Sequence, residues 1–239
     1  MKKLFLLPFS IALLAGCQST TNEENSALRK EIENLKSIQT QIAIKVGLGG
    51  LVRPDKIELS SDGIWLGSPT ADIVMIEYTD LNCPFCKKFQ QTVWPEFKKK
   101  FVDSNEVAVI ARELPLASLH PKAPYAAVML RCADAQGKYE PVKNKLFELG
   151  NNLMKENITE IVTEFELDKE VFEKCTADTS VHNIVTNSIQ EATELGLAST
   201  PTFIIGQREG NAIVNYTLLT GAGSIEAFSE AVEKVKTAK

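Results

Sequence analysis

The sequence predicts an α/β domain, and three features support this fold class. Residues 73–78 are apolar and β-branched, which is typical of a buried strand, and the mixed polar and apolar segment 83–101 is typical of a helix. Residues 107–113 form a second apolar run, so we expect two parallel strands joined through that helix by a right-handed crossover. The chain then ends in a helix, two strands and a further helix.

Turn residues delimit the C-terminal elements. In order, we predict a helix over 181–195, a strand over 202–205, a hairpin turn over 207–210, a strand over 213–219 and a helix over 224–236. Gly196 suits the position after a helix end, where a left-handed backbone is common. Inside the earlier helix, Pro95 lacks an N–H group and should kink the backbone near Trp94.

A long stretch between the two halves, residues 119–178, has the apolar pattern of several helices. Residues 53–68 have the character of a connector with a short edge strand over 56–59. This order of elements (β-α-β, then helices, then α-β-β-α) is that of a thioredoxin fold with a helical insertion. We assign this fold to residues 53–239.

Residues 1–16 have the character of an export signal. Two lysines precede an apolar run, residues 4–14, that is too short to span a bilayer. The run ends in Leu-Ala-Gly-Cys, which resembles the lipobox of bacterial lipoproteins and implies cleavage before Cys17 and acylation of its sulfur. In a Gram-negative bacterium, Gln18 would then imply sorting to the outer membrane. The alternative is ordinary secretion with a coincidental cysteine.

Residues 17–52 are predicted to contain a tether and an amphipathic helix. Residues 18–25 are rich in Ser, Thr, Asn and Glu, as flexible tethers are. The next positions alternate in steps of three and four, like the core of a coiled coil; they are Asn25, Leu28, Ile32, Leu35, Gln39, Ile42 and Val46. Glycines at 47, 49 and 50 should end the helix. We favour pairing with copies of itself, in a dimer or trimer, over folding back on its own domain.

Composition and charge limit the function classes. The formal net charge is −5, and loss of the two lysines of the signal makes it −7; an acidic chain without a basic stripe argues against nucleic-acid binding. With Cys17 acylated, an even number of cysteines remains, which suggests disulfides in an oxidising compartment. Zinc is the competing interpretation, but Cys132 and Cys175 stand alone and His120 and His182 have the pattern of surface or capping residues. We therefore expect neither a metal nor a cofactor.

Cys83 and Cys86, separated by Pro84 and Phe85, are the strongest chemical signal. They fall at the junction of the first strand and helix, where free backbone N–H groups and the helix dipole lower the pKa of a thiol. The thiolate is the attacking species in disulfide exchange, so we predict an accessible nucleophile at Cys83 and a shielded resolving thiol at Cys86. A purely structural disulfide is the alternative, but so tight a loop constrains the unfolded chain very little.

Two further positions are candidates for the same site. Glu77 lies on the predicted buried strand, where an unpaired carboxylate is costly, and is a candidate general base or proton acceptor for the Cys86 thiol. A satisfied edge residue is the plainer alternative. The proline of Thr200-Pro201 stands directly ahead of a core strand, which suggests a cis peptide bond. Such a bond would leave the Thr200 backbone free to pair with an extended substrate.

Together these motifs resemble the DsbA-like branch of the thioredoxin superfamily. The matching segments are Cys83-Pro84-Phe85-Cys86 with Glu77 upstream, residues 131–137 (RCADAQG) and residues 196–203 (GLASTPTF). The resemblance covers about Gly67 to Val235. It implies formation, isomerisation or reduction of disulfides in secreted proteins, with Cys83 and Cys86 as the redox pair and Pro201 as a cis-proline. Oligomeric members with N-terminal extensions, such as DsbC and ScsC, offer an analogy for the N-terminal helix.

Two positions depart from the DsbA pattern. DsbA has His at the position of Phe85, which can neither donate a hydrogen bond nor carry charge, so we expect a less acidic Cys83 and a less oxidising disulfide. Thr200 before the proline also resembles the isomerase-type members. The sequence therefore favours an isomerase or reductase, with a DsbA-type oxidase as the close alternative. We expect Cys132 and Cys175 to form a structural disulfide across the insertion, in preference to a second redox pair.

The predicted protein is a lipid-anchored enzyme of the bacterial envelope that faces the periplasm. Its expected partners are exported cysteine-containing proteins, a membrane redox partner and further copies of the chain. Thr200, Pro201, Pro84 and Phe85 are the predicted substrate-binding residues. Two alternatives involve no disulfide exchange: a binding lipoprotein on the same scaffold, and a copper-handling protein that uses the two thiols.

Overall fold

The computed structural model describes residues 16–46, 48 and 52–238. The chain divides into two compact units, residues 1–52 and 53–239. The predicted signal peptide lies outside the described residues except for Gly16, and so do the three glycines expected to end the N-terminal helix. In the part of the chain that the structure describes, no helix combines the length and the apolar character needed to cross a membrane.

The first unit contains α1, Gly16–Lys45. The prediction of a flexible tether over 18–25 is wrong in this structure, because α1 already includes these residues. They contain no Gly or Pro to interrupt a helix that continues into the amphipathic segment. Large apolar side chains along α1 and just after it are exposed: Leu28, Ile32, Leu35, Ile38, Ile42 and Val46.

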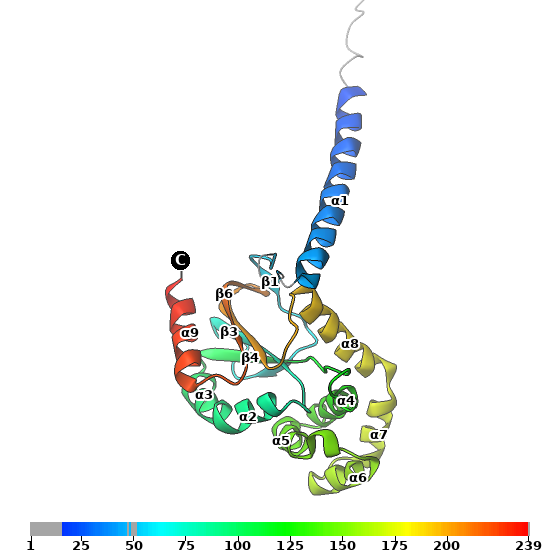
Figure 1. Cartoon of the computed structure of the whole chain (residues 1–239), viewed down its shortest axis with the longest axis vertical. Coiled ribbons are helices and arrows are strands. Elements are labelled where there is room, and N and C mark those ends of the chain that lie inside the picture. The colour runs from blue at the N-terminus through cyan, green and yellow to red at the C-terminus, as the bar shows by residue number, and fades with distance from the viewer. Residues whose placement is uncertain (1–15, 47, 49–51, 239) are drawn as a thin grey trace, which may run out of the picture. The chain divides into compact units, whose positions relative to one another are not determined.

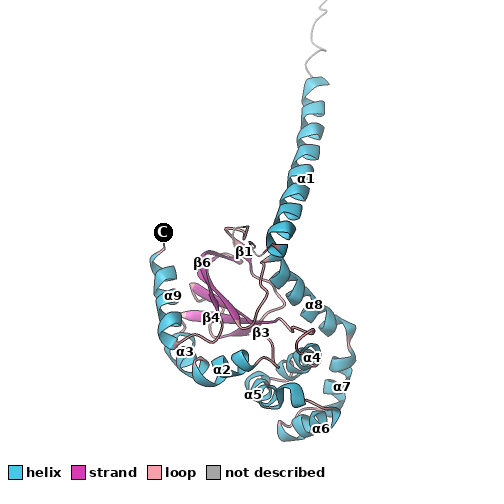
Figure 2. Ribbon diagram, viewed as in Figure 1, coloured by secondary structure: helices cyan, strands magenta, loops and turns pink. Residues whose placement is uncertain are grey.

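The second unit is built on a six-stranded sheet with the order β1-β6-β5-β3-β4-β2 (Figures 1 and 2). The strands are β1 (Ile57–Glu58), β2 (Ile64–Leu66), β3 (Ile73–Thr79), β4 (Val107–Glu113), β5 (Thr202–Glu209) and β6 (Ala212–Thr220). β3 and β4 are parallel, as predicted, and the other pairs are antiparallel. The short edge strand β2 was not foreseen, because its three residues are too few to show a period.

β3 is buried along its whole length, with helices on both faces of the sheet. One face packs on α2 (Pro84–Thr92), α3 (Trp94–Phe97) and α9 (Ile225–Thr237), and the other on α8 (Thr179–Glu194). Phe89 of α2 packs at a tilt against Phe203 of β5, with ring centroids 4.4 Å apart, and both contact Phe228 of α9. This aromatic cluster fixes the start of α2 relative to the start of β5.

The helix predicted over 83–101 is divided into α2, α3 and a π-helical turn, Lys98–Val102. The break falls at Val93, next to the predicted kink, since Pro95 has no N–H group to continue the bonding of α2. Other boundaries differ by a few residues. The hairpin turn lies at Gly210 rather than over 207–210, because β5 continues through an irregular register at Gln207. Gly196 has φ +67°, as expected after a helix end.

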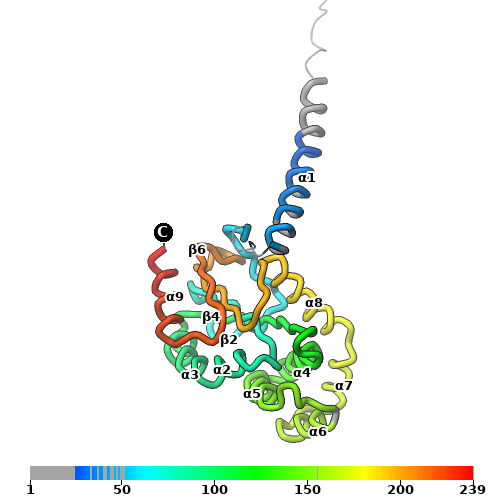
Figure 3. The backbone as a smooth tube through the Cα atoms, viewed as in Figure 1, coloured from blue at the N-terminus to red at the C-terminus, as the bar shows by residue number. Residues whose placement is uncertain are grey.

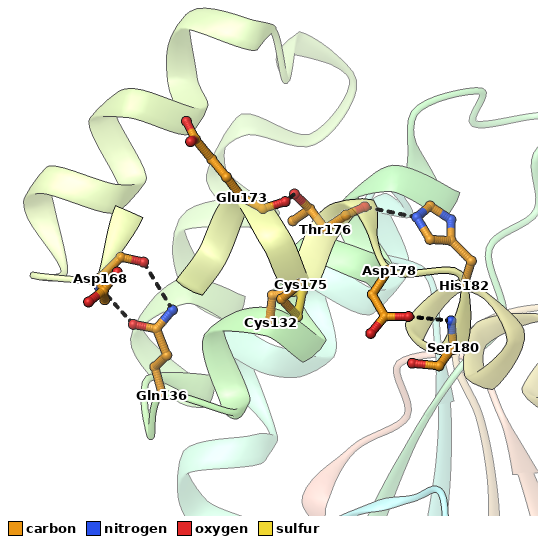
Figure 4. Close-up of a disulfide and its surroundings, with 9 residues drawn as sticks. All are labelled: Cys132, Gln136, Asp168, Glu173, Cys175, Thr176, Asp178, Ser180 and His182. Carbon is orange, nitrogen blue, oxygen red and sulfur yellow. Dashed lines mark hydrogen bonds between the residues drawn. A yellow bond between two sulfur atoms is a disulfide. The ribbon is translucent and has the colours of Figure 1, made fainter. Parts of the chain in front are cut away.

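The insertion consists of α4 (Ala123–Asp134), α5 (Tyr139–Leu149), the 3-10 turn Gly150–Asn152, α6 (Lys155–Glu164) and α7 (Lys169–Ala177). A disulfide joins Cys132 of α4 to Cys175 of α7, with Cα atoms 5.7 Å apart (Figure 4). It closes a segment of 43 residues, which in the chain-entropy account contributes about 4 kcal/mol to stability. The colours of Figure 3 show that the insertion separates β4 in sequence from the C-terminal strands that complete the sheet.

Candidate active site

Both sulfurs of the predicted redox pair lie at the start of α2. Cys83 is the N-cap residue and Pro84 the first residue of the helix, where a missing N–H group costs nothing. Cys83 exposes 5% of its surface and Cys86 1%. The order of exposure is as predicted, but Cys83 is far more covered than expected. Thr200, which is itself buried, contacts its sulfur and provides part of that cover.

Cys83 has the environment of a nucleophile. Its pKa is lowered to about 5, chiefly because the Cys86 thiol donates a hydrogen bond to its sulfur, against the opposing effect of burial. Thr200 and the backbone N–H groups of Phe85 and Cys86 add further donors. These are the free N–H groups of the first helical turn, which the sequence pattern predicted would lie at this position.

Cys86 has the opposite environment, although it is the same residue type one helical turn away. Burial raises the pKa of Cys86 well above its ordinary value, and the proton it shares with the Cys83 sulfur raises it further. The Asp80 backbone N–H, 3.5 Å from the Cys86 sulfur, acts in the other direction. Both cysteines are free thiols in this structure. The site therefore contains one ionised sulfur and one protonated sulfur.

The Thr200-Pro201 peptide bond is cis, as predicted. The Cys83 thiol lies 3.4 Å from the Thr200 carbonyl oxygen. This proximity follows from the sheet, because β5 begins at Thr202 and pairs with Tyr78 of β3, the strand that leads into Cys83. Segments more than a hundred residues apart in sequence thus meet at the redox pair.

Glu77 is fully buried in central β3, so the alternative of an edge position is wrong. Its carboxylate pairs with Lys143 of α5, whose Nζ lies 3.1 and 3.3 Å from the two oxygens. Burial works to lower the pKa of Lys143, but the Glu77 carboxylate outweighs this and the net direction is upward. Sequence reasoning missed Lys143, because a lysine on an amphipathic helix normally faces solvent.

Asp80 was also missed, and it organises the loop between β3 and α2. Its carboxylate accepts hydrogen bonds from the backbone of Asn82 at 2.7 Å and of Leu116 at 2.8 Å. Nδ1 of His120 lies 2.8 Å from the same carboxylate. His120 is therefore not the surface or capping residue that we predicted, whereas His182 is exposed and bonds the Thr176 carbonyl (Figure 4). The position of this aspartate, three residues before the C-x-x-C motif, is the sequence feature that could have marked Asp80 as part of the site.

Exposed apolar side chains lie within the C-x-x-C motif and in a groove next to segments that bond the active-site loop. Phe85, between the cysteines, is 61% exposed. An open groove of about 710 Å³ is lined by Pro121, Lys122, Tyr125, Leu153, Met154 and Ile158. Both sides of this groove are tied to the active-site loop. His120, next to Pro121, bonds Asp80, and Asn151, just before Leu153, bonds Asn82 at 3.0 Å.

Comparison with known proteins agrees with this geometry. The family model described as thioredoxin matches residues 59–234. A Rickettsia prowazekii protein, named as a protein-disulfide oxidoreductase, is 25% identical over 90% of this chain and 79% of its own. A similarly named Rickettsia felis protein is 25% identical, and the match spans 64% of its length.

Solved structures give the same fold. Wolbachia pipientis alpha-DsbA1 superposes with a TM-score of 0.64 at 24% identity, covering 77% of this chain and 94% of that one. Pseudomonas aeruginosa DsbA2 superposes with a TM-score of 0.57 at 25% identity, and the match covers 71% of this chain and 91% of that one. The chain belongs to the thioredoxin family. Its similarity to named protein-disulfide oxidoreductases and to DsbA structures supports a DsbA-like thiol:disulfide oxidoreductase.

Proposed function

We propose that this protein exchanges disulfides with exported proteins through Cys83 and Cys86. The asymmetry of the two sulfurs carries the proposal. At neutral pH, a thiol with a pKa of about 5 is ionised, whereas its partner stays protonated. One sulfur is thus ready to attack a disulfide while the other is held back until the first step is complete.

In the reductive direction, the Cys83 thiolate attacks one sulfur of a substrate disulfide. A Cys83–substrate S–S bond forms, the substrate S–S bond breaks, and the electron pair leaves on the second substrate sulfur, which takes a proton from water. Cys86 then gives up its proton to Glu77, and its thiolate attacks the Cys83 sulfur. The first substrate sulfur leaves with the electron pair. The same steps in reverse oxidise a substrate dithiol.

The favoured direction is isomerisation or reduction, with DsbA-type oxidation as the alternative. A strongly acidic thiol stabilises the reduced form and makes the disulfide more oxidising. The pKa of Cys83, about 5, lies between the values of about 7 in thioredoxin and about 3.5 in DsbA. This intermediate value supports a disulfide that is less oxidising than that of DsbA, as Phe85 suggested.

The proposed substrates are proteins that expose apolar side chains beside a cysteine. Phe85, Leu119, Tyr125 and Met154 are exposed apolar side chains on or next to segments bonded to the active-site loop. Contiguous apolar surface of this kind is typical of an interaction site. Pro84, Phe85, Thr200 and Pro201 would contact the substrate chain next to the attacked sulfur.

We propose Glu77 as the acceptor for the Cys86 proton. Side chains alternate along a strand, so Glu77 and Thr79 point to the same face of β3. Thr79 is one of the groups that act on the Cys86 sulfur. Lys143 pairs with the Glu77 carboxylate and so places a cation beside it in its buried position.

The cellular setting is also a proposal. A lipid on Cys17 would anchor the protein in the bacterial envelope, facing the periplasm, and in the outer membrane of a Gram-negative organism. A membrane redox partner would then return the cysteine pair to its working state. The exposed apolar side chains of α1 support self-association as a dimer or trimer.

The function is tested by insulin reduction and by refolding of scrambled ribonuclease, with equilibration of the cysteine pair against glutathione. We expect turnover in the wild type and none in Cys83→Ser. Turnover that survives this substitution would support the binding lipoprotein, and tight Cu(I) binding without exchange would support copper handling. A reduction potential of about −120 mV for the Cys83–Cys86 pair, together with no refolding of scrambled ribonuclease, would identify the protein as an oxidase.

A further inference from the structure

The resolving sulfur has an environment that the exchange reaction alone does not explain. Thr79 is the last residue of β3, and Asp80 follows it directly. The Asp80 backbone N–H points at the Cys86 sulfur from 3.5 Å. The Thr79 side chain is also buried, and its hydroxyl has no hydrogen-bond partner among the described residues. A buried hydroxyl without a hydrogen-bond partner destabilises the folded protein, so its presence here calls for a structural or functional explanation.

The unpartnered Thr79 hydroxyl is one of the groups that influence the pKa of Cys86. Burial is the largest influence that raises the pKa of Cys86, and the Cys83 sulfur adds to it, whereas the Asp80 N–H and the Thr79 hydroxyl oppose both. The neutral thiol directs its proton toward Cys83 and offers the hydroxyl only a weak acceptor. A thiolate at Cys86 would offer a charged acceptor, for which hydrogen bonds are roughly twice as strong.

The second donor is held in place by its own side chain. The Asp80 carboxylate is fully buried and bonds the backbone of Asn82 and Leu116 as well as the His120 ring. These three bonds fix the orientation of the residue whose N–H points at Cys86. His120 therefore acts through Asp80 and is a positioning residue.

We propose that Thr79 and Asp80 form a two-donor cradle for the Cys86 thiolate, which makes the resolving cysteine reactive at the second step of exchange. This inference rests on the proposed function. Cys86 loses its proton to Glu77, and the cradle binds the resulting thiolate. The Cys83–Cys86 bond forms as the Cys83–substrate bond breaks, and the substrate sulfur leaves with the electron pair. The first step, attack by Cys83, makes no use of the cradle.

Ellman's reagent separates the two steps. In the full-length protein carrying Cys17→Ser, with Cys132–Cys175 intact, one equivalent of reagent should release nitrothiobenzoate twice. The first release reports attack by Cys83, and the second reports attack by Cys86 on the mixed disulfide. Both rates are measured by stopped flow between pH 5 and 10 in the wild type, Thr79→Val, Thr79→Ser and, as a matched strand control, Thr217→Val.

We expect Thr79→Val to slow only the second release. Loss of one hydrogen-bond donor to the charged Cys86 sulfur should reduce the fraction of Cys86 thiolate about tenfold at pH values below the pKa of Cys86. A thiolate with a higher pKa is a better nucleophile, so each remaining thiolate should react about threefold faster. The second release should therefore be slower by about threefold. The second release should be slower throughout this pH range, because the raised pKa of Cys86 keeps it mostly protonated there. Thr79→Ser keeps the hydroxyl and should restore the wild-type rate, while Thr217→Val should match the wild type.

The charged groups around Cys86, namely Cys83, Asp80 with His120, and Glu77 with Lys143, are the same in all these variants. A slower second release can therefore be attributed to loss of the hydroxyl. An unchanged second release in Thr79→Val would overturn the cradle, and so would an equal slowing in Thr79→Ser. Absence of the first release from the wild type would instead remove Cys83 as nucleophile, and with it the proposed function.

Discussion

At the scale of single residues, the main feature is that two cysteines of one motif have opposite acidity. Cys83 lies at the open end of α2, where three kinds of donor reach its sulfur. Cys86 lies one turn inside, where burial dominates. The acidity of Cys83 depends first on the hydrogen bond from the Cys86 thiol, and the free N–H groups of the first helical turn add to it. The chain therefore needs no charged side chain between the cysteines to produce a thiolate at neutral pH.

The acidity of Cys83 predicts how the stability of the reduced protein depends on pH. The folded pKa of about 5 lies below the ordinary value of 9.0. Between these values the unfolded chain binds one proton more than the folded one, so stability rises with pH. The contribution is fully present above about pH 9 and is lost as pH falls to about 5. Because the thiol is partly accessible to solvent, we expect a few kcal/mol at most.

Thermal unfolding of the reduced protein at pH 5, 7 and 9 measures this effect. The melting temperature of the wild type should rise with pH relative to that of Cys83→Ser, which lacks the titrating group. Parallel curves for the two proteins would show that the folded thiol is not acidic. Cys86 does not interfere in this window, since its raised pKa affects stability only above pH 9.

At the scale of elements, the insertion does more than extend the fold, because α5 supplies a cation to the central strand. Lys143 reaches Glu77 of β3, and its Nζ also lies 5.9 Å from the ring centroid of Trp94 in α3. Gln90 of α2 bonds Asn144 of α5 at 3.1 Å. The helix that carries the redox pair is thus joined to the insertion by polar contacts, each of which depends on a particular pair of side chains.

Removing Lys143 should therefore be more damaging than removing the whole pair. Lys143→Met leaves the Glu77 carboxylate buried and unpaired, which costs about 3–5 kcal/mol, whereas adding Glu77→Leu should recover most of this stability. Urea denaturation of the single and double variants gives both values. If the double variant regains stability but still resolves mixed disulfides slowly, Glu77 acts on the Cys86 proton. Normal resolution would reduce Glu77 to a structural role.

At the scale of the whole molecule, one surface has no function in the redox chemistry. α1 carries exposed apolar side chains at the spacing of a coiled-coil seam, including Leu28, Leu35 and Ile42. A helix with such a row exposed to water normally buries it against a partner. An oligomer would place several redox sites on one particle, which would suit repeated attack on a misfolded substrate.

Substitution within the seam should change the size of the particle. We expect the full-length Cys17→Ser protein to sediment as a dimer or trimer and Ile42→Glu to sediment as a monomer. Ile38→Glu is the matched control, because Ile38 is also exposed on α1 but lies outside the seam. Analytical ultracentrifugation of the three proteins decides the matter, and a monomeric parent protein would contradict the prediction.

The sequence alone was sufficient wherever the signal is local or strictly periodic. The strand over 107–113, the parallel β-α-β unit, the cysteines at a helix start and the cis bond before Pro201 were predicted and are present in the structure. These features depend on residues close together in the chain, through strand periodicity, helix termini and the special geometry of proline. The disulfide between Cys132 and Cys175, which was predicted from the even cysteine count and the lack of a C-x-x-C context at either residue, is also present.

Only the tertiary structure could show which side chains pack around β3 and the active-site loop. Lys143 beside Glu77, His120 beside Asp80 and the bare hydroxyl of Thr79 have no signature in sequence, because each depends on how the insertion and the loops pack around β3. Burial and hydrogen bonding set the acidity of a group, and both are properties of the assembled core. The sequence thus identified the candidate reacting sulfurs, whereas packing determined how acidic each of them is.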